Sequence, residues 1–88
     1  MPNNEDFDLL PPETRERLAY RAVKLRQKEL RDLSDDDLAV CIWYGNQLML
    51  PDHVPLPENP DVLNKYLDYV AWLAELKQEW VRRRYTSV

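Results

Sequence analysis

Residues 38–50 read Leu-Ala-Val-Cys-Ile-Trp-Tyr-Gly-Asn-Gln-Leu-Met-Leu, and this stretch decides the fold. Its only obligate polar side chains are those of Asn46 and Gln47. At about 100° per residue, the large apolar side chains point in every direction around a helix, and such a helix must be covered on all sides. We therefore expect this segment to be the most buried helix, with the segments before and after it packed against it.

Length and composition predict a single all-α domain. The chain has 88 residues and one glycine, which is too few for the tight turns of a sheet-rich fold. Four prolines between residues 51 and 60 predict a stiff, extended linker. We expect helices near residues 12–33, 35–50 and 60–84, folded as a small up-down-up three-helix bundle with a proline-rich linker before a long C-terminal helix. Residues 1–10 are expected to form an acidic N-terminal arm, and residues 11–88 the helical domain.

The helix starts carry clear local signals. Pro12 suits a first helical turn, Ser34 can cap the helix that follows it, and Asn59 can cap the last helix. Residues 35–37 are three aspartates, which suit the positive end of the helix dipole better than a metal site. In an up-down-up path, we expect these acids to lie near Arg31 and the cations at residues 82–84.

Short apolar groups outside the helices are expected to pack on the bundle. Phe7, Leu9 and Leu10 are predicted to tuck against the first helix, with an exposed acidic-aromatic docking peptide as the alternative. In the linker, Val54 and Leu56 are predicted to hold the chain against the helices.

The first helix carries a row of cations at spacings of 4, 3, 4 and 3: Arg17, Arg21, Lys24, Lys28 and Arg31. Solvated helix faces usually alternate positive and negative charges, and this row mostly does not. Two interpretations remain open, a solvated face and a basic stripe that binds an acidic partner or anion.

The last helix carries a heptad seam that is wide enough to contact both other helices. Because this helix is longer than its neighbour, its C-terminal turns are expected to project and to self-associate through Leu76, Trp80 and Val81. We therefore expect a homodimer; the alternative is a monomer in which the linker and the N-terminal cluster cover the same surface. Other candidate interface residues are Trp43, Tyr44, Trp72, Arg82, Arg83 and Arg84.

Catalytic chemistry is not predicted. Ser34 is expected to be occupied as a cap, Cys41 lies in the apolar run, and His53 lies in the proline-rich linker, so no nucleophile–base pair can be proposed. We expect no catalytic residue, no cofactor and no metal site. The sequence has no signal-peptide pattern, and residues 38–50 are too short to span a bilayer, so a cytoplasmic protein without membrane contact is expected.

Two classes of function fit these patterns. The first is a non-enzymatic protein–protein interaction module, a small helical adaptor, inhibitor or regulator that acts by presenting a surface. The second is a nucleic-acid-binding regulatory protein that uses the basic stripe and the three C-terminal arginines. The net charge of −4 and the long linker, which does not fit a helix-turn-helix, favour the first class.

Overall fold

The computed structural model describes residues 7–86, which are helical apart from connecting turns and the linker. The elements are α2 (Pro12–Leu25), the 3-10 helix η1 (Leu30–Asp32), α3 (Asp35–Leu48) and α4 (Pro60–Thr86). No strand occurs within the described residues. The all-α fold class, with a proline-rich linker before a long last helix, is confirmed.

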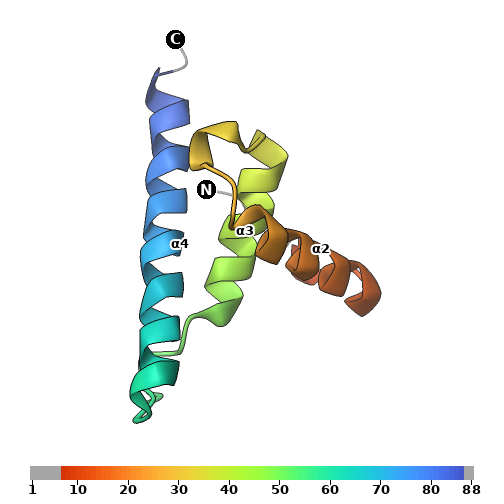
Figure 1. Ribbon diagram of the computed structural model, residues 1–88. Helices are drawn as coiled ribbons and strands as arrows, with labels where there is room; N and C mark the ends of the chain where they lie inside the picture. Colours follow the sequence, from red (N-terminus) through yellow and green to blue (C-terminus); the bar gives the residue numbers. More distant parts are fainter. Residues whose placement is uncertain (1–6, 87–88) are drawn as a thin grey trace.

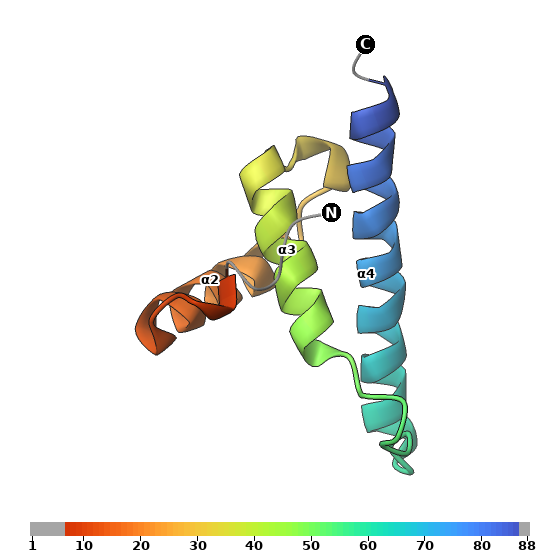
Figure 2. The ribbon, with the colours of Figure 1, turned by 180° about the vertical axis from the view of Figure 1, so that it is seen from behind.

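The arrangement of the helices leaves α2 with one main neighbour. Figure 1 shows α3 and α4 side by side and antiparallel, whereas α2 slants across α3 and away from α4. The view from behind shows the same arrangement, with η1 bridging from α2 to the upper part of α4 (Figure 2). The N-terminal end of α2 therefore projects from the α3–α4 pair.

The first helix is shorter than predicted. It ends at Leu25, after which Gln27 and Lys28 make i→i−3 backbone bonds and Glu29 is extended. Residues 26–29 are good helix formers, so the sequence contains no stop signal here. Because α2 ends at Leu25, the 3-10 turn that follows folds back and buries Leu33 in the core. This burial outweighs the helix propensity of residues 26–29.

The middle helix behaves as its sequence predicts. Ser34 accepts a hydrogen bond from the backbone N–H of Asp37 at 3.1 Å, which confirms the cap. Buried residues surround the helix on every side: Leu38, Val40, Cys41, Ile42, Trp43 and Gly45. No other helix contributes as many residues to the interior.

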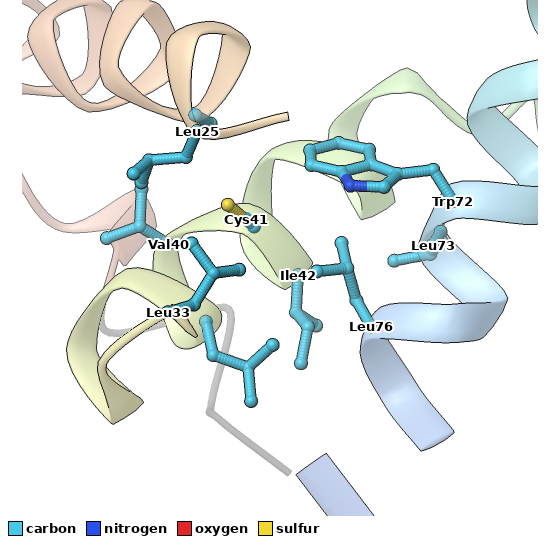
Figure 3. Close-up of a cluster of buried hydrophobic side chains, with 10 residues drawn as sticks. Leu25, Leu33, Val40, Cys41, Ile42, Trp72, Leu73 and Leu76 are labelled. Atoms are coloured by element: carbon cyan, nitrogen blue, oxygen red, sulfur yellow. The ribbon is translucent and has the colours of Figure 1, made fainter. Parts of the chain in front are cut away.

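The core forms where α3 meets α4 and the end of α2. In Figure 3, Leu73 and Leu76 of α4 point toward Ile42, while Leu25 of α2 approaches from the other side. Gly45 lies where α3 packs directly against Leu73 of α4. A Cβ atom at this position would lie 2.8 Å from Cδ1 of Leu73, so the absence of a side chain lets the two helices meet.

The expected packing of the linker is wrong, and that of the N-terminal segment is wrong for Leu9. Val54 and Leu56 are exposed, and the linker is instead attached by the Leu50 N–H, which donates to the Tyr66 hydroxyl at 3.2 Å. In the N-terminal segment, Phe7 stacks on Trp43 of α3 and packs against the core, whereas Leu9 is exposed. Leu9, Val54 and Leu56 therefore do not make the apolar contacts that the pattern predicted.

Within the described residues, no helix combines the length and the apolar character that a membrane crossing requires.

Candidate protein-interaction surface

Trp43, a candidate interface residue, is covered by the protein's own N-terminal segment. Its ring stacks on Phe7 with centroids 5.6 Å apart and an interplanar angle of 24°. Its Nε1–H points to the Asp8 carboxylate at a long 3.5 Å. Tyr44, the next residue, lies edge-on to Tyr69 of α4. Trp43 and Tyr44 therefore face different neighbours, as expected of adjacent helical residues, and both neighbours are intramolecular.

Trp72, another candidate, is buried beneath an arginine of the turn that follows α2. The guanidinium of Arg26 lies 4.2 Å from the ring centroid of Tyr69 and 5.8 Å from that of Trp72. This cation–π contact joins the end of α2 to α4. Residue spacing alone does not identify these aromatic partners of Arg26.

Arg83 is an internal link between three elements. Its guanidinium donates to the Asp35 carboxylate at 2.9 Å, to the Leu30 carbonyl at 2.9 Å and to the Glu79 carboxylate at 3.0 Å. This arrangement confirms the expected proximity to the C-terminal arginines for Asp35, whereas Asp37 pairs with Arg21 of α2. Arg31 does not join this arrangement, because it pairs with Glu29.

Glu79 is held ionised by the same cluster. Hydrogen bonds from Arg82 and then from Arg83 outweigh the effect of burial and lower the pKa of Glu79 from its ordinary value of 4.5 to about 2. Much of the charge of Arg82 and Arg83 is therefore balanced within the protein.

The five cations of the predicted stripe do not share one helix face. Only Arg17, Arg21 and Lys24 belong to α2, since Lys28 and Arg31 follow the end of that helix. Arg21 pairs with Asp37 of α3 at 2.7 Å. The stripe is therefore divided between α2 and the turn, and one of its cations ties α2 to α3.

The side of α2 that points away from α3 combines cations with apolar side chains. Tyr20 is 64% exposed, Val23 is 42% exposed, and Arg17 and Lys24 are also exposed. The Lys24 ammonium lies 4.5 Å from the centroid of the Tyr20 ring. We call these four residues the free face of α2. The sequence identified the cations of the free face but not Tyr20 and Val23. These two side chains are exposed because α2 has only one main neighbour, which the sequence does not show.

Charge is distributed unevenly along the chain. Residues 12–31 contain seven Lys or Arg and three Asp or Glu, whereas the rest of the chain contains five and thirteen. The balance is +4 for the segment that includes α2 and −8 for the remainder. The free face of α2 thus belongs to the basic part of an acidic protein.

The residues expected to self-associate lie mostly inward. Leu76 is fully buried in the core. Trp80 is half-buried against the core, its Nε1–H has no acceptor among the described residues, and Arg84 covers its ring at 4.9 Å. Only Val81 is exposed. The structure does not bring the three together on one accessible surface.

The residues considered for catalysis are not grouped. Burial is the main cause that raises the pKa of Cys41 to about 11, so the thiolate is scarce at neutral pH. His53 is exposed in the linker. Among the described residues, no group of three or more His, Cys, Asp or Glu is placed to hold a metal ion. The absence of enzymatic activity stays a prediction.

No protein-family model, curated protein or solved structure matches the chain. The surface chemistry of the protein is therefore the basis on which a function can be proposed.

Proposed function

We propose that the protein is a non-enzymatic interaction module whose free face of α2 binds an acidic, apolar segment of a partner protein. The observation that carries the proposal is the exposure of Tyr20 and Val23 beside Arg17 and Lys24. Exposed aromatic residues supply much of the energy of protein interfaces, and complementary charges guide association and orientation. The expected location of this module is the cytoplasm.

An acidic amphipathic helix fits this face better than a bare polyanion does. Its apolar side chains would cover Tyr20 and Val23 while its carboxylates approach Arg17 and Lys24. A duplex phosphate backbone would use the two cations and leave Val23 uncovered. The surplus of acids outside residues 12–31 also disfavours a polyanion that extends beyond α2.

Binding to nucleic acid through the same cations is the alternative, supported by the seven Lys and Arg of residues 12–31. A single strand could also stack a base on Tyr20. Phosphate contacts lose affinity steeply between about 50 and 200 mM salt, which separates the two classes of partner.

Fluorescence anisotropy with labelled probes tests the proposal. The probes are an acidic amphipathic peptide, a polyglutamate peptide of equal charge, and single-stranded and duplex DNA. We expect the amphipathic peptide to bind most tightly and Lys24→Glu to weaken it roughly tenfold, which is about 1.4 kcal/mol. Lys65→Glu makes the same charge change at an exposed site on α4 and should have little effect.

Two results would count against the proposal. Tighter, strongly salt-dependent binding of DNA would favour the nucleic-acid alternative. Equal weakening by Lys24→Glu and Lys65→Glu would show that the charge of the whole protein, and not the free face of α2, controls peptide binding.

A further inference from the structure

A stripe of uncharged residues runs along the outer side of α4. Its members are exposed, uncharged and spaced by 4, 3, 4, 3 and 4 residues: Leu67, Ala71, Ala74, Gln78, Val81 and Tyr85. This is a heptad pattern, and it lies on the side of α4 opposite the buried Leu73 and Leu76. We call these six residues the outer stripe.

Nothing in the described part of the chain covers the outer stripe. Figures 1 and 2 show α2, η1 and α3 all on the same side of α4. Leu67 is 48% exposed, Val81 46% and Tyr85 81%. A solvated helix face ordinarily carries charged residues, and six successive positions of a heptad seam without one are typical of a helix that pairs with another.

We propose that the outer stripe pairs with the outer stripe of a second copy of the protein, with the two α4 helices antiparallel. The flanking charges select this orientation, because residues beside a heptad seam face one another across the interface. One flank carries Asp68, Glu75 and Arg82, and the other carries Val70, Lys77 and Arg84.

The two orientations place these flanking charges differently. In a parallel pair, Lys77 would face Arg82 of the second copy, which is repulsive. In an antiparallel pair centred near residue 76, Asp68 faces Arg82 of the second copy, and symmetry forms this contact twice, whereas Glu75 and Lys77 each face their own counterpart once. The parallel pair forms the Lys77–Arg82 repulsion twice and no attractive contact, so the flanking charges favour the antiparallel pair. Arg82 already bonds Glu79, but a guanidinium has five N–H donors and can serve two carboxylates.

The sizes of the stripe residues also suit the antiparallel register. Leu67 meets Tyr85, Ala71 meets Val81, and Ala74 meets Gln78 of the second copy. The two alanines face larger side chains, which is the small-against-large alternation that lets two helices pack closely. This surface differs from the one that the sequence predicted, since Leu76 and Trp80 face the interior.

Pairing through α4 leaves the free face of α2 accessible, because α2 lies on the other side of the molecule (Figure 1). The dimer does not depend on the proposed partner of α2. If both hold, one dimer presents two free faces and binds a bivalent partner with enhanced avidity.

Sedimentation equilibrium over a concentration series tests the dimer with a matched pair of variants. Val81 lies in the outer stripe, and Val62 lies outside it on the same helix with a similar exposure of 49% against 46%. We expect Val81→Arg to weaken dimerisation at least tenfold and Val62→Arg to leave it unchanged, with circular dichroism confirming that both variants are folded. A wild-type protein that stays monomeric at submillimolar concentration, or a dimer that Val81→Arg leaves intact, overturns the proposal.

Charge reversal and a distance measurement test the orientation. Asp68→Arg should weaken the dimer, and Asp68→Arg with Arg82→Asp should restore it. A spin label on Asn64→Cys should lie about 36 Å along the axis from its copy, at 1.5 Å per residue, because the antiparallel register is centred near residue 76. Cys41 does not interfere, since it is buried and its pKa is raised to about 11. Adjacent labels would show parallel pairing and overturn the antiparallel arrangement.

Discussion

Replacing Gly45 by alanine has two opposite effects on the stability of the protein: it raises helix propensity, and it crowds the contact with Leu73. Helix propensity alone favours alanine in a helix interior by about 1 kcal/mol. The new Cβ, however, would lie 2.8 Å from Cδ1 of Leu73 and 3.3 Å from its Cβ. The Cδ1 atom of Leu73 has little room to rotate away because it lies in a packed core. The Cβ atom of Leu73 can move away only if α3 and α4 separate.

The overpacking cost is expected to exceed the gain in propensity. Forcing an extra methyl group into a packed core costs about 1–3 kcal/mol, so the net loss from Gly45→Ala is about 1 kcal/mol. For a domain of this size, that loss lowers the melting temperature by about 4–8 °C. Urea unfolding followed by circular dichroism, at one fixed protein concentration, measures the change.

A second background separates the two effects. Leu73→Val removes the Cδ1 atom that Gly45→Ala would meet at 2.8 Å, so Gly45→Ala should cost less in this background than in the otherwise unchanged protein. If Gly45→Ala stabilises the otherwise unchanged protein by about 1 kcal/mol, then α3 and α4 do not approach as closely at Gly45 as the structure indicates.

Three further predictions concern the links that hold the helices in place. Arg83→Met should reduce the free energy of unfolding by about 1–2 kcal/mol, because Asp35 and the Leu30 carbonyl lose the charged donor that joins them to α4. Arg82→Met should reduce it less, and equal losses in urea unfolding would contradict the linking role of Arg83. The depressed pKa of Glu79 contributes stability above about pH 4.5 that is lost as the pH falls toward 2, so Glu79→Gln should flatten the pH dependence of the urea midpoint in this range, and an unchanged slope would contradict the carboxylate–arginine cluster. Phe7→Ala should uncover the ring of Trp43, lower stability by about 1–2 kcal/mol and shift tryptophan emission to the red, whereas an unchanged spectrum would show that Phe7 does not cover this ring.

The parts of the fold that were predictable have local causes. Ser34 caps α3 through a bond within four residues, and Asn59 caps α4 by accepting from the Asp61 N–H at 2.9 Å. The burial of α3 on all sides followed from its composition, because no face of it can remain in water. These features required no knowledge of which segments lie together.

The break after Leu25 and the shape of the free face were not predictable, because both depend on distant contacts. Strong helix formers continue past the break, and the helix ends where the chain can bury Leu33 and place Arg26 over Tyr69. The same break removes Lys28 and Arg31 from the row of cations. The residue spacing within the first helix does not reveal that this helix packs on α3 and not on α4.

The arginines at residues 82–84 show why charge alone was insufficient to locate a site. The sequence presents them as a basic cluster that can face a partner. In the structure, Arg83 bonds Asp35 and Glu79, Arg82 also bonds Glu79, and Arg84 covers Trp80. Their engagement within the protein leaves the α2 segment as the more strongly basic surface.

The most direct test of the proposed function maps where an acidic amphipathic peptide binds. A titration of the isotopically labelled full chain, followed by backbone amide chemical shifts, reports on every helix at once. The account predicts that the largest changes fall on Arg17, Tyr20, Val23 and Lys24 and that α4 is unaffected. Changes concentrated on residues 82–84 or spread evenly over the protein would contradict the assignment of the binding surface to the free face of α2.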